Sequence, residues 1–180
     1  MLRFSTNITA EMVGMSATAK RMGRVPSGLK ASASEMNRWA GEKLGTSNMR
    51  LVDHSGLGSA SKVTADDMVQ ALVKTYDSNA LRPILKSFPM LDSNRRLIKD
   101  HPIKVDAKTG TLNFVSGLGG YMTAPDGRVL AFAIFAADEA TRRGISKANR
   151  ESPPGARSWN RRAKAMQQKL IERWGTLYGT

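Results

Sequence analysis

The feature of this sequence that most constrains its fold is a change of hydrophobic period near residue 103. Apolar and charged residues alternate over residues 103–108 (IKVDAK), which predicts a strand with one buried face. Two more strands are predicted over residues 115–123 and 128–136, and Pro125-Asp126-Gly127 between them favours an antiparallel hairpin. The last strand is apolar on both faces, so we expect it to lie inside a sheet. The sequence therefore predicts a three-stranded antiparallel meander.

Helical periods flank this meander on both sides. Helices are predicted over residues 7–21, 26–43, 80–88 and 157–174, and a further one follows the capping residue Thr64. A short strand is predicted over residues 49–52. The apolar positions of the longer helices are Ile8, Met12, Met15, Ala19, Leu29, Met36, Trp39, Met68, Leu72, Tyr76, Trp159, Ala163, Met166, Leu170 and Trp174. Helices, then a meander, then a terminal helix make an α+β arrangement.

Composition bounds the class of protein. A chain of 180 residues that is 41% hydrophobic and 24% charged can bury one core. The longest apolar run, residues 129–137, has the length of a strand, so we expect no transmembrane segment. The first 23 residues lack the apolar core of a secretory signal. Because the chain has no cysteine, disulfides, thiolate metal sites and cysteine nucleophiles are excluded.

The net charge of +13 is concentrated towards the C-terminus. Residues 142–173 contain ten basic residues and two acids, so we expect a basic linker over residues 140–156 before the helix at 157–174. One interpretation is a nucleic-acid-binding module that stacks bases on Trp159 and Trp174. Both tryptophans lie on the apolar stripe of the predicted helix, however, which favours packing on the sheet. We therefore expect no specific nucleic-acid partner.

Three short motifs carry the residue types of an acyl-transfer site. They are Ser5-Thr6-Asn7 at the start of the first helix, Asp53-His54-Ser55-Gly56-Leu57 in a turn, and Lys108-Thr109-Gly110-Thr111 at the end of the first strand of the meander. Adjacent Asp, His and Ser side chains cannot converge as a catalytic triad. The two histidines, His54 and His101, have no ligand spacing with any acid cluster, so we expect no metal and no cofactor.

Together these motifs resemble a known family. The stretch AKTGTLNFVSGLGGYMTAPDGRVLAFAIF, preceded by STNITAE and DHSGLG, is similar to the C-terminal half of penicillin-binding D-alanyl-D-alanine carboxypeptidase/endopeptidases of the class C low-molecular-mass type. The resemblance covers essentially the whole chain. It implies a partial penicillin-binding or β-lactamase-like transpeptidase fold, with residues 1–180 as the C-terminal part of one domain. His54 departs from the glycine usual in the turn, a position at which glycine would allow a positive φ.

The resemblance also assigns roles within a serine-type carboxypeptidase that forms an acyl-enzyme. Ser5 and Asn7 match a Ser-x-Asn motif that moves protons and holds the substrate amide, and Lys108 with Thr109 binds the substrate carboxylate. Gly110 lets the substrate lie against the strand, and the Thr111 N–H is one oxyanion donor. The implied substrate is a peptidoglycan stem peptide ending in D-alanine. β-Lactams are implied ligands of the full domain, and the implied compartment is the periplasm.

The family's nucleophile motif, Ser-x-x-Lys, has no good match. Ser59-Ala60-Ser61-Lys62 follows a glycine turn, and Ser27-Gly28-Leu29-Lys30 reads as a helix cap with a solvated lysine. We expect a fragment that lacks the motif and two sheet strands, which would leave residues 128–136 as an exposed edge. The alternative interpretation is a non-catalytic peptidoglycan-binding remnant that keeps Lys108 for the D-alanine carboxylate.

Overall fold

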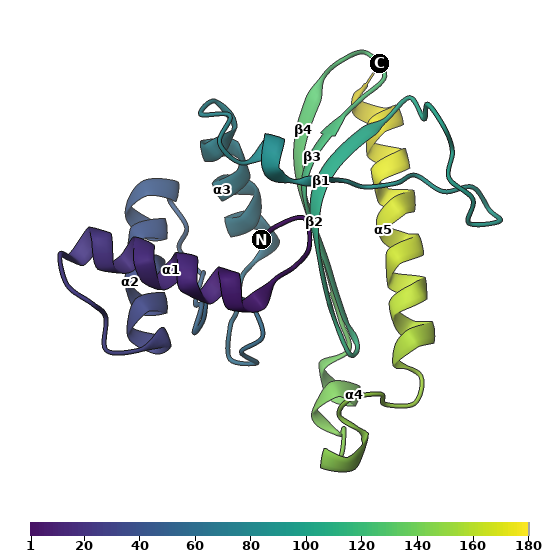
Figure 1. The fold of residues 1–180 in the computed structure, drawn as a ribbon. Helices are drawn as coiled ribbons and strands as arrows, with labels where there is room; N and C mark the ends of the chain where they lie inside the picture. The colour runs from purple at the N-terminus through teal and green to yellow at the C-terminus, as the bar shows by residue number, and fades with distance from the viewer. Residues whose placement is uncertain (180) are drawn as a thin grey trace. The chain divides into compact units, whose positions relative to one another are not determined.

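The structure, a computed structural model, describes residues 1–179 and divides into two compact units. Residues 1–84 form a unit of helices, called here the helical unit, and residues 85–180 form a unit built on a sheet, called the sheet unit. Figure 1 shows the two sets of elements, which are described separately below.

The helical unit contains the predicted helices with well-defined ends. Its elements are α1 (Asn7–Met22), α2 (Leu29–Leu44), α3 (Ala65–Tyr76) and the 3-10 turn η1 (Arg82–Ile84). α1 ends at Gly23 and α2 at Gly45, both with the positive φ that glycine adopts without strain. α3 begins where Thr64 accepts a hydrogen bond from the Asp67 N–H at 3.0 Å, which confirms the predicted cap.

The predicted apolar faces of α1 and α2 are wrong. Ile8 and Met12 are 71% and 64% exposed, whereas the buried residues of α1 and α2 include Thr18, Ser32 and Glu35. The sequence pattern could not predict this polar buried face, because its burial depends on hydrogen-bond partners 14 residues away in the chain. The strand predicted over residues 49–52 is reduced to an isolated bridge between Arg50 and Lys62.

The sheet unit holds four antiparallel strands in the order β1-β2-β3-β4. They are β1 (Lys86–Ser87), β2 (Lys104–Leu112), β3 (Val115–Thr123) and β4 (Val129–Ala137). The three strands of the predicted meander are confirmed, and the turn at Gly127 has a φ of 88°. The helix predicted over residues 80–88 is wrong: η1 and β1 occupy this stretch. Pro83 and Pro89 explain the difference, because proline lacks the N–H of a helix and restricts the residue before it.

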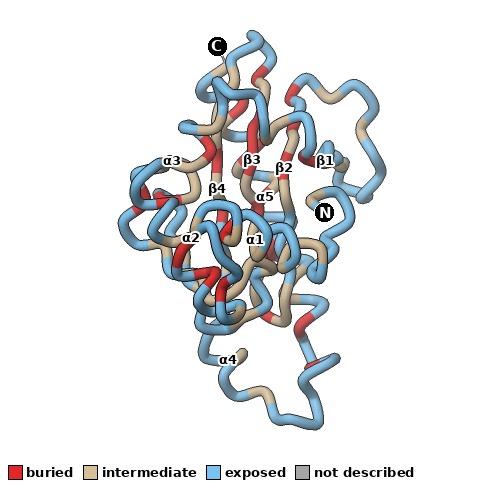
Figure 2. Tube along the Cα trace, turned by 60° about the vertical axis from the view of Figure 1, so that its left-hand side comes forward, coloured by how far each residue is buried: buried red, intermediate tan, exposed pale blue. Residues whose placement is uncertain are grey.

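One face of the sheet is covered by the terminal helix α5 (Ala156–Tyr178), as Figure 1 shows. Leu118 and Met122 of β3 share a buried cluster with Ile171 of α5, and Figure 2 shows the buried stretches along β2, β3 and β4. Where Gly120 pairs with Ala107, an added Cβ would lie 2.2 Å from the Asp106 carbonyl oxygen. This close approach requires glycine, as expected for a strand with a close neighbour.

The segment between β4 and α5, expected as a basic linker, contains two short helical elements. It contains α4 (Glu139–Arg143), capped by Asp138, and the 3-10 turn η2 (Lys147–Asn149). Within α5, Trp159 and Trp174 are partly buried, as the apolar stripe predicts, and Trp159 stacks edge-on against Phe114 at 6.2 Å. Met166 is 41% exposed, so its predicted place on that stripe is wrong.

β4 is the edge strand of the sheet formed by residues 1–179. Phe132 and Ile134 are buried, whereas Phe135 is 42% exposed. The expectation of a strand inside the sheet is therefore wrong for the described residues, in which β4 pairs with β3 on one side and with no strand on the other.

Candidate active site

The Lys-Thr-Gly motif lies on β2 just beyond the point where its outer neighbour ends. β1 pairs with β2 at Asp106 and Ala107 only. From Lys108 to Leu112, β2 is paired with β3 on one side, and no strand of residues 1–179 pairs with it on the other. The strand therefore offers an open edge at the motif.

The direction of the backbone groups at this edge follows from the register. The Phe88 N–H donates to the Val105 carbonyl at 2.8 Å, so Val105 directs its backbone groups to the outer side of β2. Because these groups alternate along an antiparallel strand, Thr109 and Thr111 direct their N–H and C=O groups outward as well. Both threonines are exposed. An extended peptide can pair with this edge as an added strand.

Lys108 is partly buried, and this burial lowers the pKa of its ammonium group below the ordinary lysine value. Its cross-strand partner on β3 is Gly119, which has no side chain to cover it. The Lys108 Nζ donates a hydrogen bond to the carbonyl of Thr109. A partly desolvated ammonium at an open strand edge favours an anionic ligand, since a carboxylate restores the charge interactions lost with water.

Beside Lys108, the sheet surface is open. A Cβ added at Gly110 would meet nothing within 4 Å, and its cross-strand partner is Gly117. The backbone is therefore accessible at Gly110, whereas the Phe135 side chain lies 3.4 Å from the Cβ position of Gly117.

The Ser-x-Asn motif lies at the start of α1 in the helical unit. Ser5 has a φ of 53°, which is uncommon for a residue with a side chain. Thr6 is the N-cap but its side chain makes no capping hydrogen bond, and Asn7 is the first helical residue. Both Ser5 and Asn7 are exposed. The two motifs thus belong to different units: one lies at the start of α1 and the other in the middle of β2.

The turn over residues 53–58 is held to α1 by a contact that the sequence analysis missed. The carboxylate of Glu11 accepts hydrogen bonds from the backbone N–H groups of His54 and Ser55, each at 3.1 Å. Burial raises the pKa of this carboxyl, but the bonds from Ser55 and His54 outweigh it, so the net shift is downward. The only available signal was Glu11 itself, a lone acid within the first 34 residues.

His54 takes the place of the family's usual glycine without strain. Its φ is not positive, and the positive φ of the turn belongs to Gly56. The His54 ring lies over Gly14, where an added Cβ would be 2.1 Å away, and Nε2 is 2.7 Å from the Ser32 hydroxyl. The Asp53 carboxylate accepts from the N–H groups of Gly56 and Gly58. Asp53, His54 and Ser55 therefore do not form a triad, as expected.

Neither Ser-x-x-Lys sequence has the geometry of a nucleophile and its base. Ser27 lies outside α2, whose N-cap is Gly28, so the expected helix cap at Ser27 is also wrong. Ser59 lies in a turn, and the Ser61 hydroxyl accepts a hydrogen bond from the Val52 N–H at 3.1 Å. Within the described residues, no hydrogen bond joins Ser27 to Lys30 or Ser59 to Lys62.

Two kinds of site are not found in the described part of the chain. No group of three or more His, Asp or Glu side chains is placed to hold a metal ion there. None of the helices formed by residues 1–179 is long and apolar enough to cross a membrane.

Comparison with known proteins connects these motifs to one family. The signature of the D-Ala-D-Ala carboxypeptidase 3 (S13) family matches residues 1–152. Carboxypeptidase DacB of Mycolicibacterium smegmatis is 32% identical over 147 residues, which are 75% of this chain and 32% of that protein. A carboxypeptidase of Mycobacterium tuberculosis is 32% identical over 154 residues, 78% of this chain and 32% of its own length. The chain thus spans about a third of these relatives.

Solved structures support the fold. Penicillin binding protein 4 (dacB) from Haemophilus influenzae, complexed with a β-lactam, has a TM-score of 0.65 at 21% identity and covers 95% of this chain and 40% of its own. A predatory endopeptidase from Bdellovibrio bacteriovorus, in complex with an immunity protein, has a TM-score of 0.58 at 18% identity and covers 96% of this chain and 42% of its own. The α+β class and its penicillin-binding-protein-like fold are therefore confirmed.

Proposed function

The chain belongs to the D-Ala-D-Ala carboxypeptidase 3 (S13) family, and from that premise we propose that it carries the substrate-binding strand of a serine-type D-alanyl-D-alanine carboxypeptidase. The substrate is a peptidoglycan stem peptide ending in D-alanine, and β-lactams enter the same groove when the full domain is present. Residues 1–180 form the C-terminal part of one transpeptidase-like domain. Since peptidoglycan lies outside the cytoplasmic membrane, the compartment we propose is the periplasm.

The observation that carries this proposal is the open edge of β2 at the Lys-Thr-Gly motif. The D-alanine tail pairs with the outward backbone groups of Thr109 and Thr111, and the N–H of Thr111 serves as an oxyanion donor. The ammonium of Lys108 and the hydroxyl of Thr109 bind the terminal carboxylate. Gly110 adds no side chain that would obstruct the peptide.

Ser5 and Asn7 complete the proposed machinery. The Asn7 amide holds the substrate amide, and the Ser5 hydroxyl moves the proton that leaves the nucleophile. Formation of an acyl-enzyme also requires a nucleophilic hydroxyl with an adjacent base. In the family resemblance this pair is Ser-x-x-Lys, and neither such sequence in these 180 residues has the geometry. We therefore propose that the 180-residue chain binds the D-alanine tail and is not itself acylated.

Binding is tested by calorimetry with a peptide ending in D-Ala-D-Ala and its L-Ala-L-Ala counterpart. Loss of a charge-assisted hydrogen bond in Lys108→Met is expected to weaken binding of the D-peptide about tenfold or more. The matched control is Lys104→Met, an exposed lysine on the same strand, which should change the affinity less than about twofold. Equal affinity for both peptides, or equal effects of both substitutions, would contradict the proposed groove.

Acylation is tested separately with a labelled β-lactam. The 180-residue chain should take up no stable label. Stable labelling would contradict the proposal that the chain is not acylated, while leaving the binding proposal intact. Loss of the label in Ser27→Ala would then identify Ser27 as the nucleophile.

The pH dependence of peptide binding provides a further test. Only the ammonium form of Lys108 attracts the carboxylate, so affinity is complete near neutral pH, where both groups are charged, and is lost as the pH rises through the pKa of this group. Because burial lowers that pKa, the loss should begin at lower pH than for an ordinary lysine near 10.4. If the affinity stays complete up to the pH at which an ordinary lysine loses its proton, Lys108 does not bind the carboxylate.

A further inference from the structure

The exposed side of α5 carries two rows of basic residues with different neighbours. The first row follows the helical spacing of four, three, four and four residues and consists of Arg162, Met166, Lys169, Arg173 and Leu177. The second row consists of Arg157, Arg161 and Lys164 and continues into Gln168 and Glu172. Successive residues of a helix differ by about 100°, so the rows lie at opposite edges of the exposed face.

The first row combines charge with exposed apolar side chains. Met166 and Leu177 are 41% and 58% exposed, and all three basic residues of the row are exposed. The second row has no exposed large apolar side chain, and it ends in an acid, Glu172, which accepts a hydrogen bond from Gln168 at 2.8 Å. Only the first row therefore offers cations and apolar groups together along one line.

The charges of this row are not satisfied within the chain. Over residues 1–179, no ion pair joins a basic residue of α5 to an acid. The opposite side of the helix packs on the sheet through Ala163, Gln167 and Ile171, so the helix cannot rotate to bury the row. With about 1.5 Å of rise per residue, the row from Arg162 to Leu177 is about 22 Å long.

We propose that this row, Arg162-Met166-Lys169-Arg173-Leu177, is a docking surface for a bilayer that carries anionic phospholipids. The cations contact the phosphate groups, and Met166 and Leu177 insert between the headgroups. A soluble polyanion such as a nucleic acid would gain from the charges but not from the two apolar side chains, and it would use the second row equally. The proposal is independent of the carboxypeptidase function and requires no membrane-spanning segment.

The test uses the 180-residue chain and sedimentation with vesicles of phosphatidylglycerol and phosphatidylcholine in equal parts. Each Lys or Arg near an anionic surface contributes about fivefold in affinity at low salt, so Arg162→Gln/Lys169→Gln/Arg173→Gln should bind about 100-fold more weakly. The matched control, Arg157→Gln/Arg161→Gln/Lys164→Gln, removes the same charge from the other edge of the helix and should bind less than about fivefold more weakly. Circular dichroism checks that both variants are folded.

A second variant tests the apolar contacts. Met166→Ser/Leu177→Ser keeps every charge and should bind the same vesicles about tenfold more weakly, since two partly inserted side chains are lost. Equal loss in the two charge variants, no effect of the serine variant, or equal binding to phosphatidylcholine alone would each overturn the proposal. Complete displacement from vesicles by duplex DNA at equal phosphate concentration would also overturn it, in favour of a general polyanion surface.

Discussion

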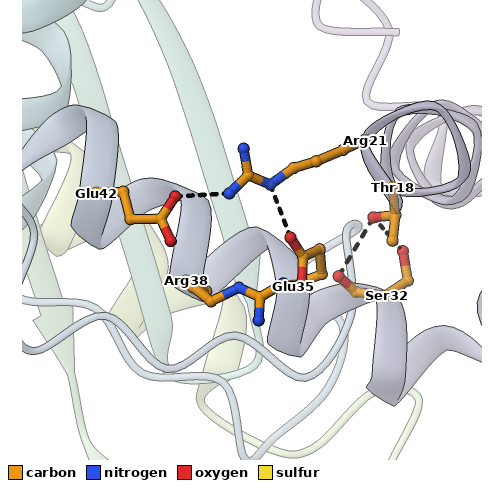
Figure 3. A network of polar contacts seen from close by, with 6 residues as sticks. All are labelled: Thr18, Arg21, Ser32, Glu35, Arg38 and Glu42. Atoms are coloured by element: carbon orange, nitrogen blue, oxygen red, sulfur yellow. Dashed lines mark hydrogen bonds and ion pairs between the residues drawn. The ribbon is translucent and has the colours of Figure 1, made fainter. Parts of the chain in front are cut away.

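The helical unit and the sheet unit bury different kinds of side chain. Between α1 and α2 the buried groups are polar: the hydroxyl of Ser32 lies 2.8 Å from that of Thr18, and Glu35 pairs with Arg21 at 2.7 Å and with Arg38, as Figure 3 shows. In the sheet unit the main buried cluster is apolar and includes the completely buried Leu118 and Ile171, and beside it Ser116 and Gln167 form one buried polar pair.

The difference determines how each unit responds to change. Apolar burial is non-directional and scales with area, so the sheet unit should be sensitive to lost volume. Buried polar groups depend on specific partners, so the helical unit should be sensitive to the loss of a single partner or to protonation of a carboxylate. The following substitutions test this contrast, beginning with the largest expected effect.

The core of the sheet unit is tested with Leu118→Ala. Because Leu118 is fully buried, truncation should lower the free energy of unfolding by about 3 kcal/mol through lost burial and a residual cavity. The control is Leu177→Ala, the same change at a residue that is 58% exposed, with an expected loss below about 0.5 kcal/mol. Urea denaturation measures both. Equal effects would show that the cluster is not a tightly packed core.

The polar interior of the helical unit is tested with Ser32→Ala. The change removes no apolar volume, but it deprives the His54 Nε2 of its hydroxyl partner while the Nδ1 is already buried without one in the described structure. An unpaired buried polar group should lower the free energy of unfolding by about 2 kcal/mol. Ser34→Ala, at an exposed position of the same helix, should change it by less than about 0.5 kcal/mol. A negligible effect of Ser32→Ala would mean that water satisfies the ring.

The same contrast explains which parts of the fold could be predicted from the sequence. β3 and β4 were predicted nearly to the residue because alternation and the Pro125-Asp126-Gly127 turn are local signals, whereas β2 extends to Leu112, beyond the alternation seen over residues 103–108. The buried faces of α1 and α2 were mispredicted because a polar residue is buried only when a distant partner satisfies it. No local pattern reveals that Ser32 meets His54, 22 residues further along the chain.

Acid should loosen the helical unit before the sheet unit. Hydrogen bonds from Arg38 and then Arg21 lower the pKa of Glu35, and a bond from Thr64 lowers that of Asp67 despite burial. A carboxyl group whose pKa is lowered in the folded state stabilises the fold at any pH above its ordinary pKa near 4. This stabilisation is lost as the pH falls through the lowered pKa. In the sheet unit the affected carboxyl is Asp138, at the exposed start of α4.

Tryptophan fluorescence can follow the two units separately during acid titration. Trp39 reports on the helical unit when Trp159 and Trp174 are replaced by Phe, and the reverse variant, Trp39→Phe, reports on the sheet unit. The Trp39 transition should occur at the higher pH. Glu35→Gln should weaken the pH dependence of that transition and leave the other unchanged. Coincident transitions in all variants would show that the two units unfold together and that the carboxylates of the helical unit are not decisive.

In the candidate site, too, the parts with a local sequence signal could be predicted and the parts that depend on distant contacts could not. Lys108 to Thr111 could be singled out as a candidate site from the sequence because the motif lies on a strand that the sequence predicts. The open edge beside it could not, since it depends on the pairing of β1 (Lys86–Ser87) with β2 stopping at Ala107, and a helix was predicted over the residues that form β1. Glu11 escaped notice because its contacts are to backbone groups more than 40 residues away.

The smallest effect is expected at the helix ends, where one glycine in each unit can be compared. Gly23 ends α1 with a φ of 67°, whereas Gly144 ends α4 with a φ of −77°, which any residue adopts. Gly23→Ala should therefore lower the free energy of unfolding by about 1 kcal/mol. Gly144→Ala, whose new Cβ would lie 3.5 Å from the Thr141 carbonyl oxygen in ordinary contact, should leave it unchanged or raise it by about 0.5 kcal/mol. Thermal unfolding measures the stability of both variants. An equal loss of stability in the two would mean that the backbone conformation of the glycine does not determine the cost of the substitution.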